Sequence, residues 1–173
     1  MGNLVIATAE ELKALSPLER QATRRAAREN PLPRLILRTF LDRGGPIPVE
    51  DIVSALPQAA PKATRDALAT LEDEDLIRIR AGQIDVAYPF SAAPTPFLVR
   101  FPGGRDRYAC CATDALGMAP MVGEPIEITS QCHHCGDALT FPVTPQGPEP
   151  ESDGVMVWFG KRDEDQCKAI DGL

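Results

Sequence analysis

The stretch YACCATDALGMAPMVGEPIEITSQC, residues 108–132, decides how the second half of this chain folds and what chemistry it carries. Its first part is apolar and rich in alanine, which predicts a helix over 108–123 that Pro120 and Gly123 bring to an end. The part that follows, PIEITS at 125–130, alternates apolar and polar residues and predicts a strand. We therefore expect a cysteine-bearing helix beside a sheet.

The flanking sequence supplies further strands for that sheet. FLVRF predicts a strand and PGGRD a turn, ALTFPV predicts a strand after the loop QCHHCGD, and VMVWF predicts another after a proline-rich loop. These segments lie at 97–101, 102–106, 138–143 and 155–159. The sequence thus predicts a small mixed or antiparallel sheet domain over 97–173, preceded by a linker, SAAPTP, at 91–96.

The N-terminal half predicts a second, helical unit. Residues 1–30 are expected to be a helical extension. Helices are then predicted over 34–43, 48–56 and 62–75, followed by a hairpin of strands at 76–80 and 83–88. Three helices followed by a hairpin are the plan of a winged helix-turn-helix, so residues 31–90 are predicted to be winged-helix-like. The whole chain is expected to be of the α+β class.

Binding to duplex DNA is the obvious function for that plan, but the charges oppose it. The third helix, which would read the DNA, offers Lys62 and Arg65 and ends in four consecutive acids, residues 72–75. Acidic side chains repel phosphates, whereas proteins that bind nucleic acid normally present a basic face. Nucleic acid is therefore not the expected partner.

Composition places the chain among globular proteins that do not cross membranes. Of 173 residues, 43% are hydrophobic and 25% are charged, and no apolar run approaches the ~20 residues of a membrane span. The N-terminus lacks the basic start and long apolar stretch of a secretory signal, so we expect a cytoplasmic protein. Five cysteines, an odd number, argue against a disulfide framework and leave thiols for metal binding or catalysis.

Two of these thiols stand next to a carboxylate. In CCATD, Cys111 and Asp114 lie three residues apart, which would place them on one face of a helix. A thiolate binds soft metals, and a neighbouring carboxylate can accept the thiol proton and deliver it elsewhere. By itself the spacing also fits a core cysteine beside an exposed aspartate.

The remaining cysteines allow metal binding and packing alike. Cys132 and Cys135 form a C-x-x-C that resembles half of a zinc knuckle, without the second half. One of them packing inward is the alternative. Cys167 follows an acidic run and, taken alone, would be an ordinary tail residue.

Together these features resemble the alkylmercury (organomercurial) lyase family. The match is most specific over residues 108–132, where the family has a tyrosine, the C-x-x-D motif, an apolar stretch with proline, a glycine, an alternating strand and S-x-C. The family also carries a winged-helix-like domain before this block.

The resemblance implies roles for individual residues. Cys111 matches the first catalytic cysteine and Asp114 the catalytic acid, while Cys167 is the candidate for the second catalytic cysteine. Cys111 and Cys167 would bind mercury. Cys132 matches a family cysteine that is regarded as structural, and Cys135 has no counterpart. The implied reaction is protonolysis of a carbon–mercury bond, in which Hg(II) remains on the two cysteines.

The resemblance also implies the partners. The substrate is a small organomercurial, cellular thiols accept the metal, and no organic cofactor is required, with structural zinc at Cys132 and Cys135 not favoured. Family members continue past the second cysteine whereas this sequence stops at Leu173, so a second copy could complete the site as a homodimer. The alternatives are a non-catalytic protein that binds mercury, copper or zinc, and a metal-responsive winged-helix regulator.

Overall fold

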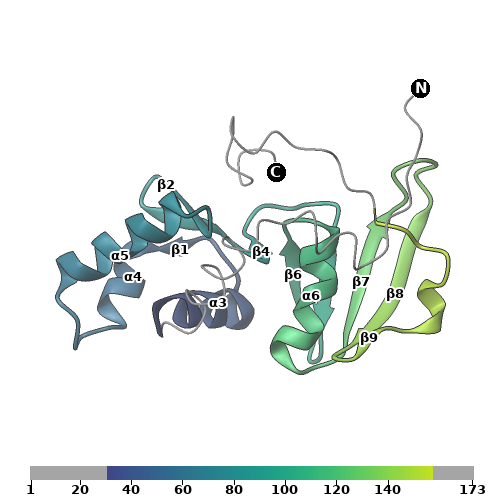
Figure 1. Cartoon of the computed structure of the whole chain (residues 1–173), viewed down its shortest axis with the longest axis horizontal. Coiled ribbons are helices and arrows are strands. Elements are labelled where there is room, and N and C mark those ends of the chain that lie inside the picture. Colours follow the sequence, from purple (N-terminus) through teal and green to yellow (C-terminus); the bar gives the residue numbers. More distant parts are fainter. Residues whose placement is uncertain (1–30, 158–173) are drawn as a thin grey trace. The chain divides into compact units, whose positions relative to one another are not determined.

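The structure, a computed structural model, describes residues 31–157, and those from Ile36 onward belong to one compact unit. The first half of the described residues contains three helices and three short strands, in the order expected of the predicted helices and hairpin (Figure 1). They are α3 (Pro31–Arg43), β1 (Ile47–Pro48), α4 (Val49–Ser54), α5 (Pro61–Asp73), β2 (Ile77–Arg80) and β3 (Gln83–Ala87). The predicted extension over residues 1–30 lies outside the described residues.

The second half consists of strands around one helix. These elements are β4 (Phe90–Ser91), β5 (Leu98–Phe101), β6 (Arg105–Ala109), α6 (Ala112–Val122), β7 (Ile126–Gln131), β8 (Ala138–Thr144), β9 (Gly147–Pro148) and the 3₁₀ turn η1 (Pro150–Ser152). Figure 1 shows α6 running along the sheet beside β6 and β7. The mixed helical and antiparallel character that the sequence predicted is confirmed.

All described strands join one antiparallel sheet in the order β1-β3-β4-β6-β5-β7-β8-β9, with β2 paired to β3. Short β4 links the two halves, because it pairs with β3 on one side and with β6 on the other. The longest pairing is the β7–β8 hairpin, which runs from Ile126↔Val143 to Gln131↔Ala138. This hairpin holds the C-x-x-C segment at its turn.

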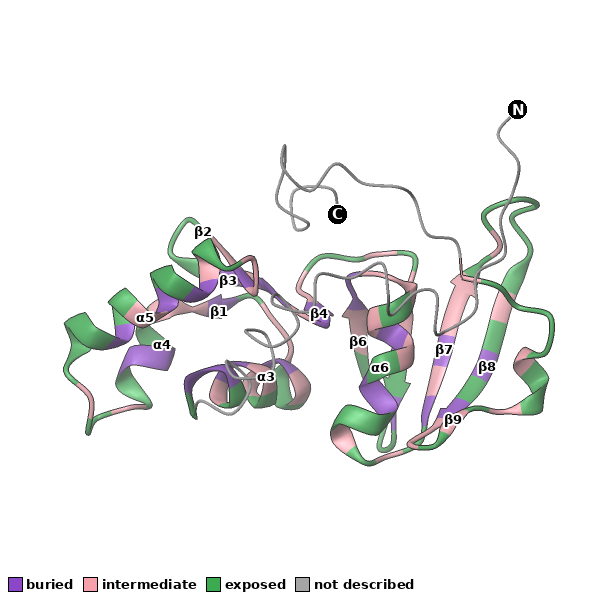
Figure 2. Ribbon diagram, viewed as in Figure 1, coloured by how far each residue is buried: buried purple, intermediate pink, exposed green. Residues whose placement is uncertain are grey.

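Alternation along these strands builds the core under α6. Ile126 and Ile128 of β7 and Phe141 and Val143 of β8 are buried, while the residues between them are more exposed (Figure 2). The helix contributes Ala115, Met118 and Ala119, which share one helical face because they are three and four residues apart. Burial of this apolar stripe fixes α6 on the sheet.

Arg107 of β6 ties the strand region to the end of α3. Its guanidinium donates to the carbonyl oxygen of Phe40 at 2.6 Å and to that of Leu41 at 2.7 and 3.1 Å. These carbonyls lie in the last turn of the helix, where backbone donors of the helix run out. Gly44, in the left-handed conformation at φ 79°, closes the same turn through its N–H to Phe40.

Several boundaries differ from the sequence prediction. The cysteine-bearing helix begins at Ala112 instead of residue 108, because the preceding residues pair as strand β6 with β5 and β4. The turn predicted over 102–106 is correspondingly shorter. Pro120 does not end α6; it lies inside the last turn, and Gly123 at φ 75° forms the C-cap. Residues 155–157 are not in a strand, and the rest of the strand predicted over 155–159 lies outside the described residues.

In the described part of the chain, no helix has the length and apolar character that crossing a membrane requires.

Candidate active site

Cys111 occupies the junction at which strand β6 gives way to helix α6. Its backbone is extended, with φ −151° and ψ 177°, and it is the N-cap residue of the helix. Asp114 lies in the first helical turn. The sequence expected both residues inside one helix, and that part of the expectation is wrong. They are nevertheless brought together, because the third residue of a helix commonly reaches back toward its N-cap.

The contact between them is short. The Cys111 sulfur lies 3.0 Å from Asp114 Oδ2, with the thiol as donor, and 2.9 Å from the hydroxyl oxygen of Thr113. Asp114 also stands at the positive end of the α6 dipole, which attracts its negative charge. The arrangement pairs a soft ligand with a group that can take its proton.

The surroundings keep the Cys111 thiol protonated. Burial raises its pKa, and the charge of Asp114 raises it further, while the Thr113 hydroxyl acts in the opposite direction. A thiolate here would be partly removed from water and placed beside another negative charge, and each of these effects disfavours it. The proton thus stays on sulfur, within reach of the carboxylate.

Cys110 has a different environment from its neighbour. It is 5% exposed and packs against Val86 and Tyr88. Burial raises its pKa well above the ordinary thiol range, and the charge of Asp114 adds to this effect. Cys110 is therefore a neutral core residue.

Thr113 is the site residue that sequence reasoning missed. Its side chain is exposed, and its hydroxyl contacts the sulfur of Cys111. The sequence did contain a signal for it, a hydroxyl residue two positions after Cys111. In the first turn of a helix such groups often bind polar atoms of the cap. A hydroxyl at this distance can donate to a thiolate and stabilise it.

Cys132 and Cys135 stand apart from Cys111, in the loop that joins β7 to β8. Cys132 is half-buried and Cys135 exposed, and the described cysteines are all free thiols. In residues 31–157, no three or more His, Cys, Asp or Glu side chains are grouped to hold a metal. The structure therefore does not bring Cys132 or Cys135 to Cys111. Cys167 lies outside the described residues, so its predicted place beside Cys111 stays a prediction.

Known proteins resemble this chain over the region that holds Cys111 and Asp114. The sequence profile of the alkylmercury lyase family matches residues 90–173. Alkylmercury lyases of Staphylococcus epidermidis (strain ATCC 12228 / FDA PCI 1200) and Streptomyces lividans are 32% and 31% identical to it over 109 residues, 63% of this chain. The chain spans about half the length of these curated relatives, 48% of each.

A solved structure supports the fold. The crystal structure of the mercury-bound form of MerB2 superposes with a TM-score of 0.60 at 22% identity, covering 81% of this chain and 63% of that one. The likeness extends beyond the residues that the family profile matches. As the motif at 108–132 predicted, residues 90–173 of this chain match the alkylmercury lyase family.

Proposed function

We propose that this chain cleaves the carbon–mercury bond of organomercurials by protonolysis. The observation that carries the proposal is the 3.0 Å contact between the Cys111 thiol and Asp114 Oδ2. It is supported by the relatives named alkylmercury lyase and by the mercury-bound form of MerB2.

The first step moves the thiol proton to the carboxylate. Mercury of the substrate R–Hg⁺ approaches the Cys111 sulfur, and a sulfur–mercury bond forms as the S–H bond breaks. Asp114 accepts the proton across the existing hydrogen bond. The approaching cation removes the electrostatic reason for the raised thiol pKa, because the negative charge on sulfur is neutralised by mercury. Deprotonation is thus coupled to metal binding.

In the second step the same proton goes to carbon. Asp114, now a neutral acid, protonates the carbon bound to mercury. The carbon–mercury bond breaks, R–H leaves, and the carboxylate is restored. A second thiolate on mercury raises electron density at that carbon and holds the product, since soft cations prefer sulfur ligands. We assign this second thiolate to Cys167, as the family resemblance implies, and the proton of its thiol passes to water as the second sulfur–mercury bond forms.

The metal is substrate and product in this scheme, and no organic cofactor takes part. Hg(II) would leave the Cys111–Cys167 pair on small thiols, which are abundant in the cytoplasm, where we place the reaction. A homodimer remains a further proposal, and structural zinc is not favoured.

For residues 31–90 we propose a winged-helix-like packing domain and, for 97–173, the catalytic domain. Ion pairs on the third helix support packing over DNA reading. Arg65 binds both carboxylate oxygens of Glu50 at 2.7 and 2.9 Å, and Lys62 binds Asp66 at 2.7 Å. Both cations of the helix are therefore already matched by acids of the same chain, which weakens any attraction to phosphates.

Product analysis with phenylmercury in excess small thiol tests the proposed activity. Wild-type protein should release benzene, and Cys111→Ala should release none above the rate in buffer. Cys110→Ala is the matched control, because it removes the neighbouring thiol from the core and should retain turnover. Tight mercury binding without benzene release would instead establish a sequestering protein, the main alternative. Equal turnover by Cys111→Ala would refute the assignment of the nucleophile.

A further inference from the structure

A second thiol pair lies at the turn of the β7–β8 hairpin. Residues 132–137 form this turn, which is closed by the register pair Gln131↔Ala138. The Cys132 N–H donates to the Asp137 carbonyl at 2.8 Å, and the Gly136 N–H donates to the Cys132 carbonyl at 2.8 Å. Gly136 adopts φ 78°, which lets the chain reverse within these few residues. The backbone therefore holds Cys132 and Cys135 on one tight turn.

Both thiols on this turn are free. Cys132 and Cys135 are three residues apart, and C-x-x-C spacing on a turn lets two sulfur atoms bind one metal ion.

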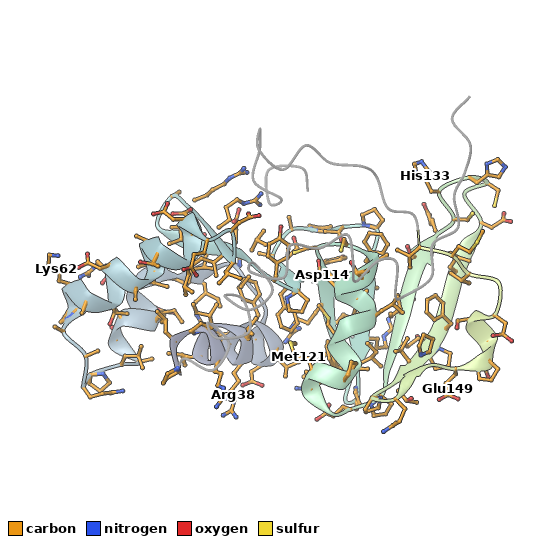
Figure 3. All side chains as sticks on the ribbon, in the orientation of Figure 1. Arg38, Lys62, Asp114, Met121, His133 and Glu149 are labelled. Carbon is orange, nitrogen blue, oxygen red and sulfur yellow. The ribbon has the colours of Figure 1, made fainter. Side chains whose placement is uncertain are left out.

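The site is accessible and separate from Cys111. Cys135, His133 and His134 are exposed, and Figure 3 shows His133 at the outer end of the β7–β8 hairpin, away from Asp114 on α6. A metal ion in solution can therefore reach the pair without passing through the candidate active site.

We propose that the Cys132–Cys135 turn is a second metal site, which binds mercury(II) as a two-coordinate dithiolate. Structural zinc takes four ligands, and residues 31–157 group no three side chains of the ligating types. Mercury(II) is soft and satisfied by two sulfur atoms. Binding forms two sulfur–mercury bonds, releases two thiol protons and changes no oxidation state. The choice of mercury rests on the proposed function, whereas the dithiol geometry does not.

Mercuric ion itself is the probe, added to the full-length chain with Cys111→Ser to remove the first site. Equilibrium dialysis against excess monothiol measures the metal that stays bound. We expect one tightly retained equivalent, with two protons released. Adding Cys132→Ser and Cys135→Ser should lower the retention about 10²-fold or more, because the chelate becomes a set of single-point contacts. His133→Asn with His134→Asn, on the same turn, is the matched control and should retain the ion.

Three results would overturn the proposal. They are equal mercury retention after loss of both turn cysteines, loss of retention in the histidine control, and zinc held as tightly as mercury. Because the turn is exposed, circular dichroism should show every variant folded. Benzene release from phenylmercury is measured separately on the wild-type chain, so a failed lyase with a functional dithiol, or the reverse, is recognised as such.

Discussion

Replacing Asp114 with asparagine tests the central step of the proposed reaction. Asparagine keeps the size of the side chain but cannot take up the proton that the Cys111 thiol now directs at Oδ2 over 3.0 Å. Mercury capture should persist, since the soft ligand is unchanged. Proton delivery to carbon should not, because the amide that replaces the carboxylate cannot accept the thiol proton and pass it on.

The size of the loss follows from the role assigned to the carboxylate. A positioned general acid contributes ~10²–10⁴-fold to rate, which corresponds to about 3–5 kcal/mol of activation free energy at 1.36 kcal/mol per decade. The substitution also removes a negative charge beside sulfur. After burial, that charge is the largest cause of the raised Cys111 pKa, so the pKa should fall. More thiolate at neutral pH means faster alkylation of Cys111.

The two effects of Asp114→Asn therefore have opposite signs, which makes the test sharp. Single-turnover release of benzene from phenylmercury measures the first, and the rate of Cys111 alkylation by iodoacetamide measures the second. We expect slow cleavage together with fast alkylation. A general loss of structure would not give slow cleavage together with faster alkylation of Cys111 in a protein that is otherwise folded. Cleavage within about threefold of wild type would refute the proton-transfer role, and slower alkylation would refute the electrostatic account.

Three further outcomes are expected. Cys167→Ser should keep weak mercury binding and lose benzene release; turnover equal to wild type would show that the tail thiol is a bystander. Arg107→Met should lower the free energy of unfolding by about 1–2 kcal/mol, since two carbonyls at the end of α3 lose a charged donor. An unchanged melting temperature would contradict this. The free energy of unfolding should fall as pH rises past about 9, because the buried Cys110 thiol keeps its proton when the unfolded chain loses it. Cys110→Ala should reduce this fall in the free energy of unfolding with pH. An unaltered fall would mean that other titrating groups cause it.

The helices and the two hairpins could be predicted because their patterns are local. Helix α5 spans 61–73 against the predicted 62–75, and β2 and β3 pair as the alternation around Ala81-Gly82 indicated. Strand β6 could not be predicted in this way. RDRYA places polar residues at most positions, and its extended form depends on pairing with β5 on one side and, on the other, with β4, which lies further back in the sequence. Tertiary pairing thus overrode the local preference for helix.

Strand β6, which the sequence did not predict, changes the reason why Cys111 contacts Asp114. The two residues do not share the face of one helix; Cys111 caps the helix in whose first turn Asp114 lies. Had both residues stood inside a helix, Cys110 and Cys111 would have been two adjacent helical positions with little to distinguish them. At a strand-to-helix junction the chain turns between them. Cys110 continues into the core, whereas Cys111 becomes the cap, toward which the first helical turn directs the Thr113 hydroxyl and the Asp114 carboxylate. The same C-C-A-T-D letters therefore yield one inert thiol and one thiol with a proton acceptor. The C-x-x-D spacing selects the second because a cap and the third residue of its helix are where a short side chain can reach back.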